Sequence, residues 1–252
     1  EADVSLNTDG TQIITAYRAS ADSTLQDLRY WDRTPGLRIA TRTLSTSHQF
    51  AAFARDGKSF LSLRPAAGGV NTVQRFDAQQ GAAIGPVIKL KQINKSTGRG
   101  ATAQPAMALD PSEKTLYVVS NDGAVTTKGC ALGFVRLYDA KSGKMLERNI
   151  PLGGEYMCAA FDDACETLTV VVGDDRAVQE QKYSIRKLDL TKGETIGEPV
   201  DLGRTSFREL ACSPDGKWRV TPGTGTSIRL WAGAPGDSNE YPPGDRRAPT
   251  TR

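Results

Sequence analysis

The pentapeptide Ser-Pro-Asp-Gly-Lys at residues 213–217 and the pentapeptide Ser-Ile-Arg-Leu-Trp at residues 227–231 form the last copy of a pattern that recurs along the chain. Each earlier copy pairs a turn segment with a later strand segment that carries an arginine and ends in Asp. Aligned in this way, the arginines are Arg29, Arg75, Arg136, Arg186 and Arg229, so the steps between copies are 46, 61, 50 and 43 residues. A period of about 40–50 residues is typical of the blades of a β-propeller.

Each copy predicts four short antiparallel strands. The Asp-Gly pair at residues 56–57 supplies a tight hairpin turn between the first two strands, because Gly adopts positive φ at little cost. Apolar residues nowhere keep a sustained helical spacing, so we expect almost no helix. The chain is therefore predicted to be all-β, with residues 1–232 forming a β-propeller of about five four-stranded blades. The predicted repeats are residues 3–44, 48–91, 104–152, 155–203 and 206–232.

The alignment also predicts which side chains pack between neighbouring blades. The last apolar residue of each third strand is expected at one equivalent packing position; these residues are Trp31, Phe76, Tyr138, Leu188 and Trp231. A second set, on the first and second strands, is expected to be buried: Phe53, Leu61, Leu109, Val118, Phe161, Val170, Leu210 and Val220.

The repeat resembles a known family. Residues 207–217, followed by 227–231, are similar to a WD-repeat blade, and a weaker likeness extends over residues 3–232. Only Trp31-Asp32 keeps the literal Trp-Asp dipeptide, and the Gly-His pair that often opens such a blade is absent, since His48 is the one histidine of the chain. The chain therefore resembles the divergent, bacterial type of WD-like repeat. The resemblance implies a non-catalytic protein-interaction scaffold or sensor module, with a protein partner and a further domain upstream in a larger signalling protein.

The two ends of the repeat array raise the question of ring closure. The last copy ends with its third strand, and residues 233–252 are rich in Pro, Gly and charge, which predicts a disordered tail. Neither terminus offers an obvious fourth strand for the last blade. Two interpretations stay open: a five-bladed ring that closes incompletely, or a truncated larger ring whose other blades lie upstream. Residue 1 is Glu rather than Met, so we expect an upstream segment that was removed or is not included.

The composition describes an ordinary globular protein. The 252 residues carry a formal net charge of +3, and the basic residues are scattered among the acidic ones. Nucleic-acid binding is therefore not predicted. No apolar stretch approaches the roughly 18 residues of a membrane-spanning helix. A cytoplasmic location is predicted, with a periplasmic or secreted location as the alternative.

Few residues are candidates for chemistry. The cysteines Cys130, Cys158, Cys165 and Cys212 lack Cys-x-x-Cys spacing and neighbouring histidines, so no zinc site is predicted. Cys158 and Cys212 fall at matching places on first strands, where we expect small buried residues, with a disulfide as the alternative. The acidic pairs at 162–163 and 174–175 do not match a calcium-binding loop. We therefore predict no metal, no cofactor and no catalytic residue.

The alternative function is a propeller enzyme of the lactonase or quinoprotein kind, acting at a central channel. Such a site needs His, Glu, Asp or Asn side chains that converge on the channel. A single histidine, His48, makes that cluster hard to build.

The predicted partner-binding surface is a rim of loops. Residues 18–26, 120–133 and 173–182 are expected as long loops between second and third strands, and residues 91–104 as a longer link between two repeats. Loops of this kind commonly carry binding residues on a rigid scaffold. The candidate residues of this rim are Arg18, Arg99, Lys128 and Arg176. The alternative is that these loops are only tolerated insertions.

Overall fold

The computed structural model describes most of the repeat region. The described residues are 2–6, 11–18, 26–32, 40–44, 50–54, 56–65, 70–91, 105–125, 131–162, 164–174, 182–203, 210–212, 218–222, 228–232 and 238–241. Every regular element among them is a β-strand, and none of them lies in a helix. The prediction of an all-β chain is confirmed.

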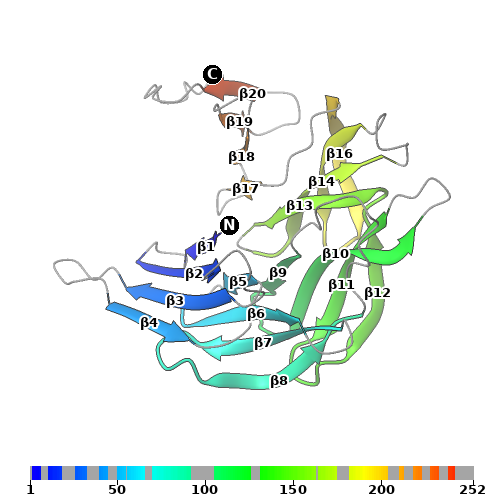
Figure 1. The fold of residues 1–252 in the computed structure, drawn as a ribbon. Coiled ribbons are helices and arrows are strands. Elements are labelled where there is room, and N and C mark those ends of the chain that lie inside the picture. Colours follow the sequence, from blue (N-terminus) through cyan, green and yellow to red (C-terminus); the bar gives the residue numbers. More distant parts are fainter. Residues whose placement is uncertain are drawn as a thin grey trace. The chain divides into compact units, whose positions relative to one another are not determined.

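The strands form five antiparallel sheets of four strands, and in each sheet the strands lie side by side in chain order (Figure 1). The first sheet contains β1 (Ala2–Leu6), β2 (Gln12–Arg18), β3 (Gln26–Asp32) and β4 (Ala40–Leu44). The second contains β5 (Phe50–Phe53), β6 (Ser59–Pro65), β7 (Asn71–Asp77) and β8 (Ala83–Lys89). The third contains β9 (Ala106–Leu109), β10 (Thr115–Val125), β11 (Ala131–Asp139) and β12 (Met145–Pro151).

The remaining strands complete the fourth and fifth sheets. The fourth contains β13 (Glu155–Phe161), β14 (Thr167–Gly173), β15 (Tyr183–Asp189) and β16 (Glu194–Gly203). The fifth contains β17 (Ala211–Cys212), β18 (Trp218–Pro222), β19 (Ile228–Ala232) and β20 (Ser238–Tyr241). The chain divides into two compact units, Glu1–Tyr156 with the first three sheets and Met157–Arg252 with most of the last two.

The five sheets share one register. In each sheet, the last residue of the third strand pairs with the first residue of the second strand. These pairs are Asp32 with Gln12, Asp77 with Ser59, Asp139 with Thr115, Asp189 with Thr167, and Ala232 with Trp218. The residues one position earlier are therefore equivalent, as predicted: Trp31, Phe76, Tyr138, Leu188 and Trp231. Of these, Phe76, Tyr138 and Leu188 are buried and Trp31 is half-buried, while the Trp231 side chain lies outside the described part.

The shared register corrects one position of the sequence alignment. Arg136 pairs with Val118 three residues before the end of its strand, but Arg75 pairs with Leu61 and lies only two residues before the end of β7. Gln74, not Arg75, is therefore the counterpart of Arg136. Because neighbouring residues of a strand point to opposite faces, the shift of one residue places Arg75 on the other face of its sheet.

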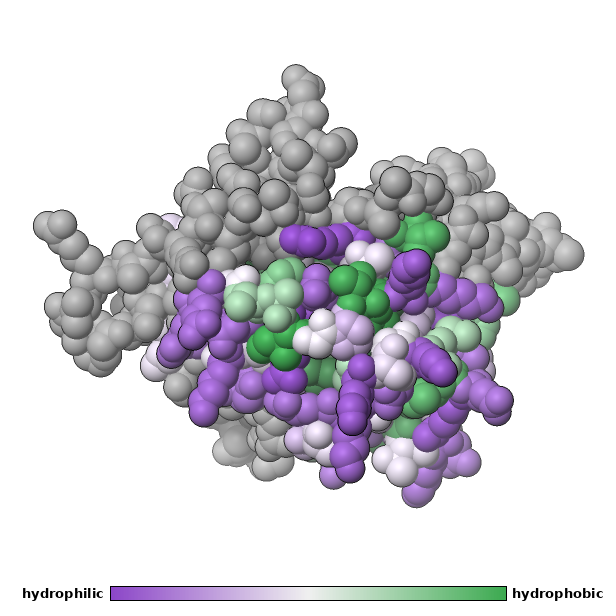
Figure 2. Space-filling model, turned by 90° about the horizontal axis from the view of Figure 1, so that it is seen from below, coloured by the Kyte–Doolittle hydropathy of each residue, from purple (hydrophilic) through white to green (hydrophobic). Residues whose placement is uncertain are grey.

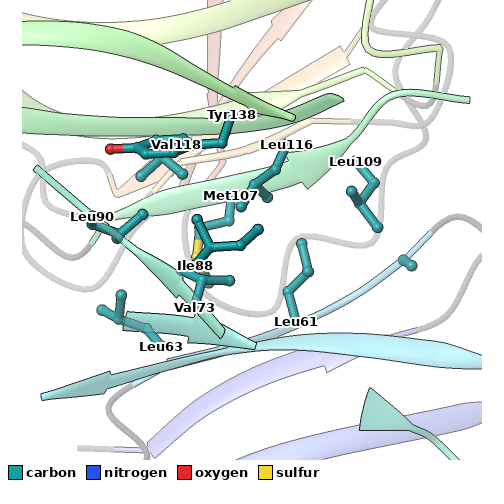
Figure 3. Packing of buried hydrophobic residues seen from close by; sticks show 11 residues of the cluster. Leu61, Leu63, Val73, Ile88, Leu90, Met107, Leu109, Leu116, Val118 and Tyr138 are labelled. Carbon is teal, nitrogen blue, oxygen red and sulfur yellow. The ribbon is translucent and has the colours of Figure 1, made fainter. Parts of the chain in front are cut away.

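The main core cluster lies between the second and third sheets. Leu61, Leu63, Val73 and Ile88 of the second sheet face side chains of the third sheet (Figure 3). The third sheet contributes Met107, Leu109, Leu116, Val118 and Tyr138. A smaller cluster joins the first two sheets through Ile14, Ala51, Phe60, Phe76 and Ala78. The second sheet thus buries one face against the first sheet and the other face against the third, as stacked blades do.

The predicted core set is confirmed in part. Leu61, Leu109, Val118 and Val170 are buried. The others, Phe53, Phe161, Leu210 and Val220, are half-buried. Phe53 and Leu210 nevertheless pack against core clusters of the first and second units, respectively.

Two predictions about loops and ends are wrong. Much of the segment 120–133 is strand rather than loop, because β10 runs to Val125 and β11 begins at Ala131, with Val125 paired to Ala131. The fifth sheet also has its fourth strand: β20 pairs with β19 and lies inside 233–252, the segment predicted to be a disordered tail. Its sequence, Ser-Asn-Glu-Tyr, has little β-branched or apolar character, which explains why the pattern missed it.

Candidate functional site

The carboxylate that ends the third strand has a structural role in three sheets. Asp77, Asp139 and Asp189 each accept hydrogen bonds at Oδ1 from backbone amides two or three residues ahead, at distances of 2.6–2.9 Å. A glycine with positive φ follows four residues after each Asp, at Gly81, Gly143 and Gly193. The Asp therefore fixes the turn into the outer strand, a common use of Asp near glycine.

The turn between the first and second strands is also held by an Asp carboxylate. The position of this Asp within the turn differs between the sheets. In the second sheet, Asp56 Oδ1 accepts hydrogen bonds from the amides of Lys58 and Ser59. In the third and fourth sheets, Asp110 and Asp162 accept from the two equivalent amides, although each lies two positions earlier in its turn. Asp162, a member of the acidic pair at 162–163, thus binds the amides of its own turn.

These turns require one residue with left-handed backbone. Gly57 has φ of 62° in the second sheet, and its counterparts Glu113 and Cys165 have φ of 57° and 49°. Each donates its amide to the carbonyl three residues back, so the three positions are equivalent. A non-glycine residue is disfavoured in this conformation, so a stabilising contact of the Glu113 side chain would offset part of that cost.

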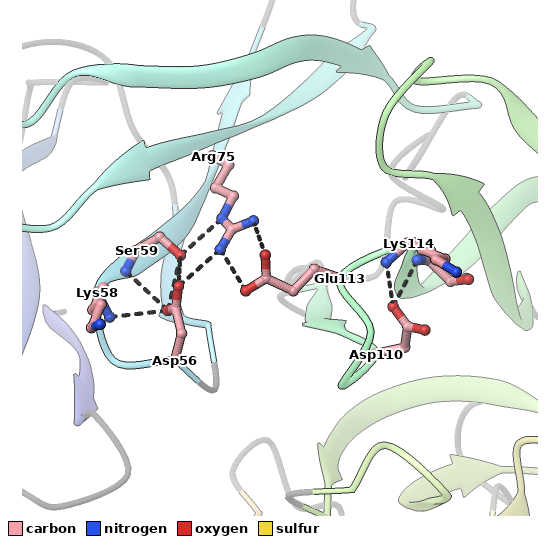
Figure 4. Close-up of polar contacts among 8 residues, drawn as sticks. Asp56, Lys58, Ser59, Arg75, Asp110, Glu113 and Lys114 are labelled. Atoms are coloured by element: carbon pink, nitrogen blue, oxygen red, sulfur yellow. Dashed lines mark hydrogen bonds and ion pairs between the residues drawn. The ribbon is translucent and has the colours of Figure 1, made fainter.

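Such contacts exist at Glu113. Arg75 Nη1 donates to Glu113 Oε2 at 2.8 Å, and Arg75 Nη2 donates to Oε1 at 2.8 Å (Figure 4). The same guanidinium reaches Asp56 Oδ2 at 2.9 Å and Ser59 Oγ at 2.8 Å. We call Arg75, Asp56, Ser59 and Glu113 the ion cluster. It links the turn of the second sheet to the turn of the third.

The electrostatics of the ion cluster favour a stable ion pair rather than proton transfer. The hydrogen bond to Glu113 raises the pKa of Arg75 above its ordinary value, and Asp56 adds to the effect against an opposing contribution from burial. Arg75 therefore keeps its proton, and both carboxylates already accept its hydrogen bonds. Bidentate pairing of this kind fixes geometry as well as charge. The arrangement therefore holds the second sheet in a fixed position against the third.

A second polar contact anchors the chain where the second repeat ends. The buried Tyr138 hydroxyl accepts a hydrogen bond from the Lys91 amide at 3.0 Å. Burial raises the pKa of Tyr138, which keeps the hydroxyl protonated. The contact ties the end of the second repeat to the third sheet just before the link at 91–104.

The predicted rim residues lie largely outside the described part. Arg18 is the last residue of β2 and pairs with Gln26 across a hairpin end, but its side chain is not described. Arg99, Lys128 and Arg176 lie outside the described residues, as do His48 and Cys130. Cys158 is buried on β13, as expected for a small apolar residue, whereas the Cys212 side chain is not described.

The described residues offer neither a cluster of metal ligands nor a membrane-spanning helix. Among them, no three His, Cys, Asp or Glu side chains gather in a way that could hold a metal ion. Within the same part of the chain, no helix is long and apolar enough to cross a bilayer.

One surface feature was not singled out from the sequence. The outer strands β8 and β12 expose large apolar side chains, Ile84 and Val87 on the first and Met145 and Leu146 on the second. The repeat predicts a fourth, outer strand in each blade, but it does not show which face of that strand stays uncovered. In β8 the adjacent apolar pair Val87 and Ile88 was the available signal, since one of two neighbours must point away from the core.

Comparisons with known proteins identify the fold. The chain is similar to a solved structure of Kuenenia stuttgartiensis hydrazine synthase, with a TM-score of 0.62 and 13% sequence identity over 96% of this chain. It is also similar to TolB from Acinetobacter baumannii, with a TM-score of 0.62 and 15% identity over 92% of this chain. The fold is a β-propeller. The chain spans 66% of the hydrazine synthase chain and 52% of the TolB chain.

The propeller fold alone does not assign this chain to a family. No family model matches this sequence, and no curated protein matches it either. The five sheets are therefore the predicted blades, whereas the WD-repeat likeness of 207–217 and 227–231 stays a prediction. At 13% and 15% identity, the two structural neighbours share a fold with this chain, and a shared fold alone does not assign an activity.

Proposed function

We propose that this chain is a non-catalytic protein-interaction domain, a scaffold or sensor built on a WD-repeat-like propeller. The observation that supports this most strongly is the repeated use of polar groups to hold the blades. The recurring Asp carboxylates bind turn amides, and the Arg75 guanidinium joins two blades. A scaffold stiffened at each turn presents its surface in one geometry, which reduces the entropy cost of binding.

The proposed partner is a protein that binds the rim of loops. Arg18, Arg99, Lys128 and Arg176 give this rim a basic character. The proposal includes a cytoplasmic location and a further signalling domain upstream of this propeller. It excludes nucleic acid, a cofactor and a metal as ligands.

The test replaces the link 91–104 with a short Gly-Ser turn. The fold should survive, because the entropic cost of changing a surface loop's length grows slowly. The replacement, and a variant with Ser at all four rim positions, should weaken partner capture from the native cell lysate. Lys192→Ser is the matched control, since Lys192 is an exposed lysine on the turn that leads into the outer strand β16.

Three outcomes would overturn the proposal. One is unchanged capture by both variants with an intact circular-dichroism spectrum. Another is robust turnover of a lactone, sugar or alcohol by the purified domain, which would favour the propeller enzyme instead. Binding of a metal by three or more protein ligands would have the same consequence.

A further inference from the structure

The junction between the fourth and fifth sheets buries a charged group where the junction between the second and third buries leucine. Arg219, the second residue of β18, is 5% exposed, and its Nε donates to the Thr169 hydroxyl of β14 at 3.1 Å. Both strands belong to the second compact unit, Met157–Arg252. The equivalent positions of β10 and β6 hold Leu116 and Leu61, which pack in the main core cluster. A guanidinium therefore stands at an interior position.

Lys187 brings a second positive charge next to Thr169. The two residues are direct partners across the β14–β15 ladder, so their side chains leave the same face of the sheet, with Cβ atoms about 5 Å apart. Lys187 is half-buried. Within the described part of the chain, no carboxylate pairs with its ammonium group or with the Arg219 guanidinium. Two cations thus flank one hydroxyl.

The ion cluster shows which group is missing here. Lys187 holds the place of Arg75, since each lies two residues before the Asp that ends its third strand. Arg75 pairs with Glu113, a residue of the next sheet's turn that stands two positions before β10 (Figure 4). The residue two positions before β18 is Gly216, which has no carboxylate. The junction therefore keeps the cation, adds Arg219 and lacks the counter-charge at this place.

Two carboxylates at the same end of the fourth sheet already have partners. Asp189, which pairs with Thr167 across the ladder, accepts hydrogen bonds from two backbone amides of its own turn. Asp162 accepts from the amide and the hydroxyl of Thr167. A buried charge without a counter-ion is costly. Arg219 and Lys187 therefore favour an anion that comes from outside the chain.

We infer that Arg219, Lys187 and Thr169 bind a small oxyanion of the phosphate or sulfate class, either as the free ion or as the phosphoryl group of a small metabolite. The two cations balance a doubly charged anion. The fork of N–H groups on a guanidinium matches two oxygens of such an anion. The Thr169 hydroxyl accepts from Arg219 Nε and keeps its own hydrogen to donate to another oxygen.

This ligand differs from the protein partner proposed above, and the site shares no residue with the rim. The site and the proposed function can therefore be tested separately. Variants of the rim should bind the anion normally, and loss of the anion site leaves the proposal of a protein-interaction domain in place.

The experiment is isothermal titration calorimetry of the 252-residue chain with sodium phosphate. The buffer contains no other multivalent anion, and its ionic strength is constant because salt screens exposed charges. We expect saturable binding of one phosphate. Lys187→Met should weaken it about tenfold, which corresponds to about 1.4 kcal/mol. Arg219→Met should abolish it, and Met suits a position whose counterpart in the third sheet is Leu116.

A matched control separates this site from the surface. Hydrophilic side chains cover much of the face seen from below in Figure 2, so weak contacts with scattered surface cations are expected as well. Lys192→Met removes a lysine of the same unit whose side chain is 70% exposed, and it should bind phosphate normally. Phosphate should also raise the urea midpoint of the unmodified chain and of Lys192→Met, because a ligand of the folded state stabilises it. Should Arg219→Met fail to fold, the comparison of Lys187→Met with Lys192→Met decides.

Other anions identify the ligand. Sulfate should bind as phosphate does. Glycerol phosphate that binds as tightly as phosphate indicates the phosphoryl group of a metabolite, and weaker binding indicates the free ion. Acetate carries a single charge and should bind at least about tenfold more weakly. Equal binding of acetate would overturn the inference in favour of a carboxylate site. Absence of phosphate binding would overturn it in favour of a carboxylate of this chain, and equal loss in Lys192→Met in favour of unspecific surface binding.

Discussion

Arg75 and Glu113 form a bidentate ion pair that joins the second blade to the third, with both N–O distances at 2.8 Å. The pair depends on two local departures from the repeat. Arg75 is shifted by one residue relative to Arg136 and so faces the third blade. Glu113 occupies a left-handed turn position that Gly57 fills in the preceding blade. Each departure alone would be unfavourable or neutral, and together they place two opposite charges in contact.

Two substitutions of Glu113 should separate the contribution of the ion pair from the cost of the left-handed backbone. Glu113→Ala removes the ion pair and keeps a side chain in the left-handed conformation, so we expect the free energy of unfolding to fall by about 1 kcal/mol. Glu113→Gly also removes the pair, but Gly adopts positive φ readily, so its loss should be smaller. Urea unfolding measures both. Equal losses would show that the backbone conformation at this turn costs nothing.

Tyr138→Phe should destabilise the junction between the second and third blades. The hydroxyl accepts a hydrogen bond from the Lys91 amide, and Tyr138 is only 1% exposed. We expect a loss of about 1 kcal/mol, the usual net value of one hydrogen bond. Amide hydrogen exchange at Lys91 should accelerate in the variant. An unchanged exchange rate would mean that the amide is protected by another acceptor.

Asn121 should tolerate loss of its side chain better than a change to Asp. Its Nδ2 donates to the Tyr156 carbonyl at 2.9 Å, and its Oδ1 accepts from the Tyr156 amide at 2.7 Å, both in a buried setting. Asn121→Ala removes both bonds, with an expected cost of about 2 kcal/mol. Asn121→Asp keeps the acceptor but brings a carboxylate against a buried carbonyl, so we expect at least about 3 kcal/mol.

Thermal and urea unfolding should rank these two variants, and the pH dependence of Asn121→Asp gives a check. Protonating the new carboxylate restores a donor and removes the charge. The Asp variant should therefore recover stability relative to the Ala variant as pH falls. The reverse ranking at neutral pH would contradict a role for the paired amide.

Asp139 should titrate below its ordinary pKa of 3.8, because hydrogen bonds from the Ser142 hydroxyl and amide stabilise its charged form. A lowered pKa in the folded state means that the stabilisation is present above the ordinary value and is lost as pH falls through the lowered one. Carboxyl chemical shifts followed by NMR measure the midpoint. Ser142→Ala should move the midpoint up toward the ordinary value, and a midpoint above 3.8 in the unmodified chain would refute the turn's role.

The sequence could predict the blades because each one repeats the same local chemistry. Asp-Gly turns, third strands that end in an aromatic residue and Asp, and a later Gly are local patterns, and each is explained by the conformation of its own few residues. The equivalence of Trp31, Phe76, Tyr138, Leu188 and Trp231 followed from them and is confirmed by the shared register. The absence of sustained helical spacing likewise predicted the all-β fold.

The sequence could not predict features that depend on pairing between distant segments. β20 is a strand because β19 offers it an edge, and not because of its own residues. β10 continues to Val125, and β11 begins as early as Ala131, because the two segments pair with each other there.

The candidate sites depended on tertiary structure most of all. Arg75 was aligned with Arg136 because a shift of one residue is invisible until the register of β6 and β7 is known, yet that shift reverses the direction of the side chain. Strand β8 shows the same limit. Ile88 is buried and Val87 is exposed in the same strand, and only the packing of the third blade against β8 decides which of the two meets solvent.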